Sequence, residues 1–202
     1  MPEITRPIVR LSLLITPAAD AERDAFTMAD RERHLDAKLA AVRDLAHSWS
    51  STLPEGAMFE DFEARMIEAV RQAGCAATEM MLARAEESSR KDKPPLFGIG
   101  ETTFRLSGSE PRSFNTWFGV TRYRRSYARS VEGGVGHFPL DLELGLLGDR
   151  ISPTLLVTGA RLATRMSFAE AREVLGWFVP DAPSTEVLEQ AVLGLGHHTE
   201  GW

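Results

Sequence analysis

The sequence predicts a mainly α-helical protein with a small β-hairpin region, an α+β fold. Its expected order is a long helical hairpin, a β-hairpin and a helix-turn-helix-like unit. Three observations predict it: apolar residues at three- and four-residue steps before residue 88, aromatic and β-branched residues between 102 and 128, and helix-capping serines after residue 150. A polar run at 88–95, ending in two prolines, predicts a boundary between domains 1–95 and 96–202.

The composition is that of an ordinary globular chain. Hydrophobic residues make up 43% of the 202 residues and charged residues 26%. Cys75 is the only cysteine, which excludes an internal disulfide and a cysteine-based zinc site, and no cofactor is expected. The chain opens without a signal-peptide pattern, and its apolar stretches are too short to span a bilayer. We therefore expect a soluble cytoplasmic protein without a membrane partner.

Two long amphipathic helices are predicted in the first half. Residues 20 to about 50 are rich in helix formers, and a second apolar pattern runs from 59 to about 87. A short link with proline and glycine joins them, which favours an antiparallel hairpin that serves as an oligomerisation region. The weaker pattern at 7–15 predicts a short strand or a packed arm.

Strands are predicted after the linker. Residues 102–106 favour an extended segment, and 112–117 pair with 120–128 around a turn within 115–119. A loose glycine-rich loop follows, and the chain becomes helical again from Pro139.

Three capping serines then predict three helices. Ser152, followed by proline, begins a helix that ends near residue 163. Ser167 and Glu170 form a capping box for a helix to residue 178, and Ser184 caps a last helix to about residue 195.

Positive charge is concentrated in one segment. The whole chain carries a net charge of −6, which is unfavourable for binding nucleic acid unless basic residues are gathered locally. Residues 111–130 contain five arginines and no acidic residue. These arginines are Arg112, Arg122, Arg124, Arg125 and Arg129.

Alternation on a strand separates this basic segment into two faces. Arg122 and Arg124 are expected on one face, and Tyr123, Arg125 and Tyr127 on the other. In a DNA-binding interpretation, the arginines contact phosphates while Tyr123, Tyr127 or Trp117 packs against sugars or bases. In a structural interpretation, the arginines keep an edge hairpin soluble and the aromatic residues lie in the core. The residues leave both interpretations open.

The last two helices have the order of a helix-turn-helix. Ser184 and Thr185 at the start of the final helix are candidates for reading base edges, and Arg161 and Arg165 for contacting the DNA backbone. The final helix also carries two glutamates and no basic residue before His197, so phosphates would repel it. A plain packed pair of helices is the alternative.

Several short elements of the second half follow one another in a recognisable order. They are Thr103–Arg105, the run Trp117–Tyr127 with Gly119-Val120 and Arg125-Ser126-Tyr127, Pro139-Leu140-Asp141, Leu144-Gly145-Leu146, Ser152-Pro153, Met166–Ala171 with Leu175, and Ser184-Thr185 with Val187. In order and spacing they resemble the Kra-type group of bacterial insertion-sequence transposases, over residues 100 to 196. The first half matches that group only in its helical character.

The resemblance implies a protein that binds transposon ends. In complete members, an RNase-H-like domain cuts and joins DNA with two metal ions held by three carboxylates. We expect that domain to lie beyond the last helix of this chain, which would then be a truncated, non-catalytic transposase fragment. Members of the group often carry Cys-x-x-Cys before the Pro-Leu-Asp element. Residues 128–137 contain no cysteine here, so a zinc cofactor is not expected.

No constellation of residues favours an independent enzyme. His137, Asp141 and Glu143 are close in sequence, but the resemblance makes Asp141 a capping or turn residue. We expect a DNA-binding protein of transposition and recombination whose partners are transposon ends and either further copies or a full-length transposase. The alternative is a helical interaction or oligomerisation protein that does not bind DNA.

Overall fold

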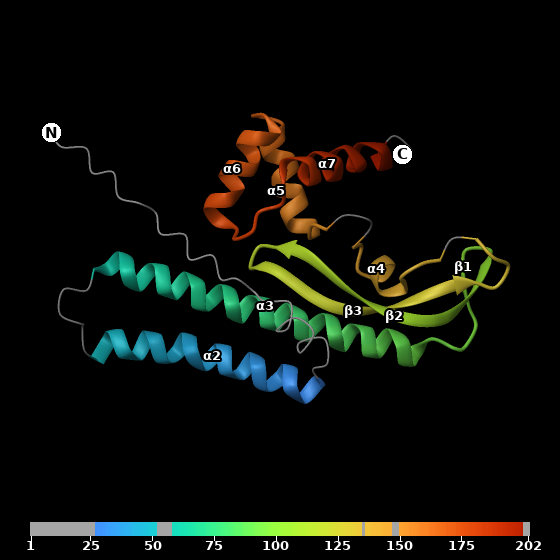
Figure 1. The fold of residues 1–202 in the computed structure, drawn as a ribbon, viewed down its shortest axis with the longest axis horizontal. Helices are drawn as coiled ribbons and strands as arrows, with labels where there is room; N and C mark the ends of the chain where they lie inside the picture. The colour runs from blue at the N-terminus through green and yellow to red at the C-terminus, as the bar shows by residue number, and fades with distance from the viewer. Residues whose placement is uncertain (1–26, 52–57, 135, 147–149, 200–202) are drawn as a thin grey trace.

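A computed structural model describes residues 27–51, 58–134, 136–146 and 150–199. Its elements in chain order are α2 (Met28–Ser51), α3 (Phe59–Asp92), β1 (Phe97–Ile99), β2 (Thr102–Thr116), β3 (Gly119–Ser130), α4 (Pro139–Glu143), α5 (Pro153–Ala163), α6 (Phe168–Phe178) and α7 (Thr185–Thr199) (Figure 1). The predicted α+β class is confirmed. The strand or arm predicted at 7–15 lies outside the described residues.

Helices α2 and α3 form the predicted antiparallel hairpin and lie side by side (Figure 1). The rings of Trp49 and Phe62 meet with centroids 5.2 Å apart, near the end of α2 and the start of α3. Thr27 caps α2: its hydroxyl accepts from the backbone N–H of Asp30 at 3.2 Å, and its own N–H donates back to the Asp30 carboxylate at 2.9 Å. Residues 20–26, where we predicted the first turns of this helix, are outside the described part of the chain.

Helix α3 is longer than the sequence indicated. We predicted a linker from residue 88, but the helix continues to Asp92. Contacts between side chains four residues apart extend it: Lys91 pairs with Glu87 at 2.6 Å, and the Ser88 hydroxyl donates to Asp92 at 3.2 Å. Basic Arg90 and Lys91 in the last turn also suit the negative end of the helix dipole.

The three strands form an antiparallel sheet in the order β1-β2-β3. The predicted hairpin is confirmed, with Arg112 opposite Tyr123 and Thr116 opposite Gly119 across a turn at residues 117–118. Strand β2 also includes 107–111, which the predicted strand segments did not cover. Strand β1 pairs only with Thr102–Phe104, so a proline at position 111 removes no hydrogen bond to β1.

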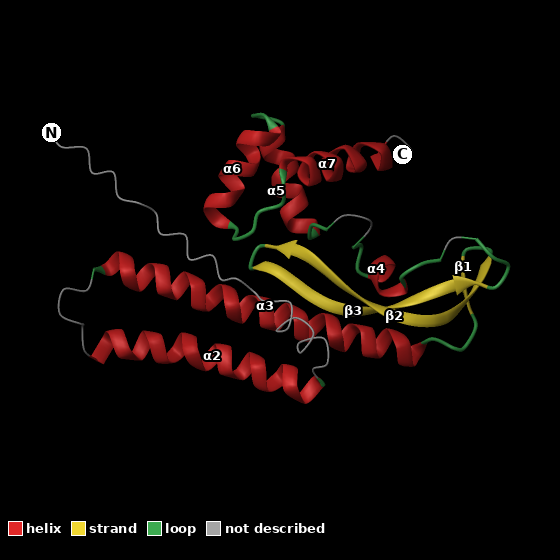
Figure 2. Cartoon of the chain, in the orientation of Figure 1, coloured by secondary structure: helices red, strands yellow, loops and turns green. Residues whose placement is uncertain are grey.

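Helices lie on both sides of the sheet. Figure 2 shows β2 and β3 passing along the C-terminal half of α3, with α4 on the other side of the strands. One buried cluster joins these layers. It contains Leu82, Phe114, Tyr123, Leu140 and Leu146. The helical first half and the strands of the second half therefore share a core.

Helices α5, α6 and α7 pack against one another beyond the hairpin turn (Figure 1). Their caps are those predicted: Ser152, Ser167 and Ser184 each accept a hydrogen bond from the backbone N–H three residues later. Buried Leu155, Leu175 and Leu188 form the centre of their core. No helix in the described part of the chain has both the length and the apolarity that crossing a membrane requires.

Candidate nucleic-acid interface

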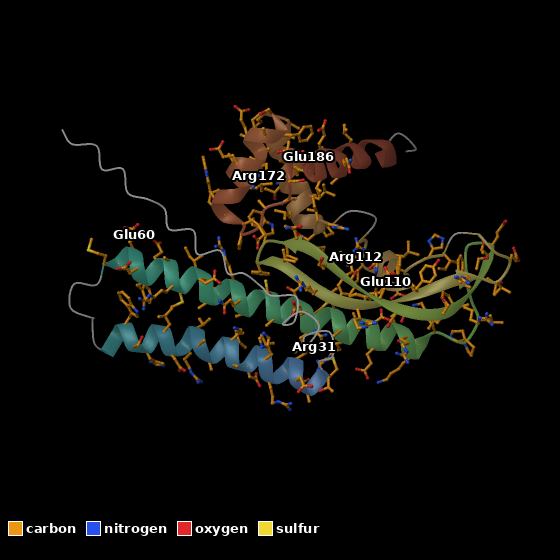
Figure 3. All side chains as sticks on the ribbon, in the orientation of Figure 1. Arg31, Glu60, Glu110, Arg112, Arg172 and Glu186 are labelled. Carbon is orange, nitrogen blue, oxygen red and sulfur yellow. The ribbon has the colours of Figure 1, made fainter. Side chains whose placement is uncertain are left out.

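The arginines predicted to bind DNA divide into an inner group and an outer group. Arg112 and Arg125 extend from β2 and β3 toward α4, and their side chains are only 10% and 14% exposed. Figure 3 shows Arg112 and Glu110 beside α4. Arg124 and Arg129 are exposed, and Arg122 is half-buried. The sequence does not show this division, because it depends on what α4 covers.

A buried carboxylate holds the inner group together. Asp141, 8% exposed in the first turn of α4, accepts hydrogen bonds from Arg112, Arg125 and the Tyr123 hydroxyl. Arg112 also donates to the backbone carbonyl of Leu146 at 3.1 Å. We call these four residues, Arg112, Tyr123, Arg125 and Asp141, the Asp141 cluster. Two guanidinium groups and one hydroxyl satisfy a carboxylate that would otherwise be expensive to bury.

Aromatic rings complete the surroundings of the cluster. The guanidinium carbon of Arg125 lies 3.4 Å from the centroid of the Phe138 ring, and Tyr127 packs against the same ring. The contacts of Tyr123, Arg125 and Tyr127 confirm that they share one face of β3. Burial, together with the Asp141 carboxylate, raises the pKa of Tyr123 well above its usual range, so its hydroxyl remains a donor.

Three of the predicted DNA-contacting residues belong to the Asp141 cluster. Arg112, Tyr123 and Arg125 were predicted as DNA contacts, and the structure gives each of them an internal role instead of an open surface position. Asp141 itself is neither a helix cap nor a simple turn residue: it is the ion-pair partner of both strands. Contact of Arg112, Tyr123 and Arg125 with DNA remains a prediction.

Two arginines near the middle of β3 also contact the protein. The backbone N–H of Arg122 donates to the Glu79 carboxylate of α3 at 3.1 Å. The Arg124 guanidinium lies across the neighbouring strand and donates to the Ser109 carbonyl at 3.1 Å and to its hydroxyl at 3.2 Å. Arg124 is exposed, so an anion can still approach it.

The far end of the hairpin carries a pair of arginines. Arg129 of β3 lies directly opposite Arg105 of β2, and both are exposed. Among the described residues, neither guanidinium forms an ion pair with an acidic side chain. Like charges at directly opposed positions destabilise a strand pair. Our sequence prediction did not include Arg105, because it lies outside the 111–130 segment. The register of the hairpin places it opposite Arg129.

The residues predicted in the last three helices are mostly at the surface. Arg161 and Arg165 are exposed, and Thr185 is half-buried. The Ser184 hydroxyl is engaged as the cap of α7, 3.3 Å from the N–H of Val187. Glu186 and Glu189, the two glutamates noted in the predicted last helix, are exposed on α7. Figure 3 shows Glu186 and, on α6, Arg172.

A depression of about 540 Å³ lies beside the Asp141 cluster. Three arginines line it, Arg112, Arg125 and Arg150, together with His137. Asp141 and Glu110 lie in the same wall, so its charge is mixed. In the parts of the chain that are described, no three histidine, cysteine or acidic side chains are grouped closely enough to hold a metal ion.

On the opposite face of the sheet, Glu86 of α3 accepts hydrogen bonds from Ser126, at 2.8 Å from its backbone N–H and also from its hydroxyl. Burial raises the pKa of the Glu86 carboxyl, although the two Ser126 hydrogen bonds partly oppose the shift. A carboxyl with a raised folded-state pKa stabilises the fold below its unfolded pKa, and this contribution is lost as pH rises through the folded pKa.

We therefore expect Glu86→Gln, which keeps a carbonyl acceptor for Ser126, to gain stability relative to the natural protein as the pH rises from about 4 to about 7. Urea unfolding at the two pH values measures the difference. The exposed neighbour Glu87, whose pKa is lowered by Lys91, is the matched control: Glu87→Gln should lose relative stability over the same interval. An equal change in both variants would show that the burial of Glu86 is not the cause.

Comparison with known proteins adds no further assignment: no family model, no curated protein and no solved structure matches the chain. The candidate interface therefore depends on the geometry described above.

Proposed function

We propose that this protein binds duplex DNA through the phosphate backbone, using the far end of its β-hairpin. The observation that carries the proposal is the exposed pair of Arg105 and Arg129, opposed in register and without an acidic partner among the described residues. A phosphate between the two guanidinium groups would convert their repulsion into two charge-assisted hydrogen bonds.

The charge distribution of the chain favours a contact with DNA at one basic site over a contact spread across the whole surface. The net charge of −6 disfavours a broad approach to DNA, so affinity must come from a few concentrated arginines. Alternation places Arg129 on the face of β3 that also carries Arg125, beyond the part covered by α4. Arg124 is exposed as well, but it lies near the middle of β3 and on its other face, so it is not part of this contact.

The helical unit has a secondary part in this proposal. Arg161 and Arg165 are exposed and available for phosphate contacts, and Thr185 is the remaining candidate for a base contact. Ser184 is engaged as a cap, and Glu186 and Glu189 on α7 would oppose a deep insertion into the major groove. We expect the hairpin to dominate affinity and the helical unit to adjust orientation.

The resemblance to insertion-sequence transposases indicates which kind of DNA the chain would bind. We propose that the chain is related to the DNA-binding part of insertion-sequence transposases, that it recognises transposon ends in the cytoplasm, and that it acts without catalysis of its own. The shared sequence elements support this assignment, and the arginine pair gives it a mechanism.

Fluorescence anisotropy with a labelled mixed-sequence duplex tests the proposal. At low salt we expect the natural protein to bind and the Arg105→Ala/Arg129→Ala variant to bind at least about tenfold more weakly, since each lost phosphate contact removes charge-assisted hydrogen bonds. These two residues are preferable to Arg112 and Arg125 as targets, because they are not needed by the Asp141 cluster.

A double variant with the same charge change is the control. Arg43 and Arg65 are exposed on α2 and α3, and replacing both with alanine should leave binding nearly unchanged. Replacing the exposed acidic residues near the arginine pair, Glu101 and Glu132, with glutamine should strengthen binding. Equal weakening by both arginine double variants would mean that only net charge matters and would refute the site.

A further inference from the structure

Helix α3 carries a line of exposed apolar side chains. Phe59, Val70 and Met81 follow one another at eleven-residue intervals and are 73%, 46% and 49% exposed. Eleven residues make about three helical turns, so these side chains share one side of the helix over about 33 Å. Ile67, 46% exposed, lies beside them. Large apolar groups arranged in this way mark an interaction surface more often than a solvent-facing one.

Helix α2 extends the same surface. Arg84, one turn beyond Met81, forms an ion pair with Glu32 of α2 at 2.8 Å, which identifies the side of α2 adjoining the apolar line. Leu39 is two turns from Glu32 on that side and is 51% exposed. It lies near the middle of the line, since its neighbour Lys38 contacts Gln72 of α3 at 2.9 Å.

The tip of the β-hairpin adds one more ring. Phe118 packs against Gly74, where a Cβ would overlap its ring, yet 40% of the residue remains exposed. Gly74 is seven residues after Ile67 and seven before Met81, so Phe118 lies at the centre of the line. We refer to Leu39, Phe59, Ile67, Val70, Phe118 and Met81 as the apolar stripe.

The other sides of α3 are already in use. One packs on α2 through Phe62 and Gln72, and another on the strands, where the Cys75 thiol donates to the Phe118 carbonyl at 3.3 Å. The apolar stripe is a third side, whose members are 40–73% exposed, and its edge meets α6, where the Arg71 guanidinium donates to the Phe178 carbonyl. We propose that it binds a second copy of this chain, with the two α3 helices antiparallel across a two-fold axis near Gly74. This inference concerns self-association and is independent of DNA binding.

Charge and shape favour a second copy as the occupant. A two-fold axis at Gly74 brings Ile67 of each copy opposite Met81 of the other and places the two Phe118 rings, which cover Gly74, at the centre of the contact. The same axis brings exposed Glu63, one turn before Ile67, within one residue of the position opposite exposed Arg84, one turn after Met81. The Arg84 guanidinium also pairs with Glu32 of its own chain. Opposite charges thus flank the apolar centre twice in one symmetric contact. A self-complementary pattern of this kind is what an isologous dimer requires.

Sedimentation equilibrium of the full chain tests the dimer. We expect association at concentrations up to about 100 μM, and at least about tenfold weaker association for Val70→Glu, since the dimer would bury an unpaired charge. Val70 is partly exposed already, so the variant should fold, and far-UV circular dichroism checks this. Arg65→Glu is the control, because Arg65 lies about 200° around the helix from Glu63.

A charge exchange tests the register, with all variants carrying Glu32→Gln so that Arg84→Glu does not place two carboxylates side by side within one chain. Glu63→Arg alone should weaken association by placing arginines opposite each other, and the double variant Glu63→Arg/Arg84→Glu should restore it. A natural protein that stays monomeric at about 100 μM, or a folded Val70→Glu variant that dimerises as strongly as the natural protein, would overturn the proposal. Failure of the exchange to restore association would overturn the register. None of these measurements includes DNA, so their failure leaves the arginine-pair proposal untouched.

Discussion

Replacing Asp141 with alanine is expected to lower the free energy of unfolding by about 3–5 kcal/mol, the cost typical of removing one member of a buried ion pair. The variant leaves Arg112 and Arg125, 10% and 14% exposed, as neighbouring positive charges without their shared carboxylate. It also removes the acceptor of the buried Tyr123 hydroxyl. Asp141→Asn, which keeps an acceptor but loses the charge, should fall between alanine and the natural residue.

Urea unfolding followed by circular dichroism measures this effect. Glu143 on the same short helix is the control: its side chain is 46% exposed and pairs with Lys93, so Glu143→Ala should cost about 1 kcal/mol or less. Equal losses for Asp141→Ala and Glu143→Ala would contradict a structural role for the Asp141 cluster.

The second large effect is expected in the core of the three C-terminal helices. Leu188 of α7 is fully buried, and it packs so closely on α5 that a Cβ at Gly159 would overlap its side chain. Leu188→Ala should cost about 2–5 kcal/mol, because it leaves a cavity where the helices meet. The loss should appear in the unfolding of α5–α7, since the residue belongs to their core cluster.

Leu193 on the same helix provides the comparison. It is 56% exposed, so Leu193→Ala should change stability by about 0.5 kcal/mol or less. Thermal unfolding of the two variants separates burial from helix propensity, because both make the same substitution in α7. A Leu188→Ala variant as stable as Leu193→Ala would show that α5, α6 and α7 do not form a packed unit.

The sequence predicted the elements that local chemistry determines. Ser152, Ser167 and Ser184 cap the helices they were expected to cap, because a hydroxyl and a backbone N–H three residues later need no distant partner. The pairing of 112–117 with 120–128 was predicted in the same way from a short turn, but the exact register was not. The length of β2 did not follow, since whether Pro111 interrupts a strand depends on how far β1 extends beside it.

The candidate site was predicted less completely, because it depends on contacts between distant residues. Asp141 pairs with Arg125 16 residues earlier and with Arg112 29 residues earlier. A run of arginines shows where positive charge is concentrated, but not which guanidinium groups a following helix will cover. Arg105 was missed because only the strand register, which the sequence does not show, places it opposite Arg129.

The most direct test of the central proposal is the salt dependence of DNA binding. The logarithm of the association constant should fall linearly with the logarithm of salt concentration, with a slope of about 0.9 per phosphate contact. The Arg105→Ala/Arg129→Ala variant should lose about two units of that slope, whereas the Arg43→Ala/Arg65→Ala control should keep it. An unchanged slope in the hairpin variant, or no binding by the natural protein at low salt, would contradict a phosphate contact at the hairpin.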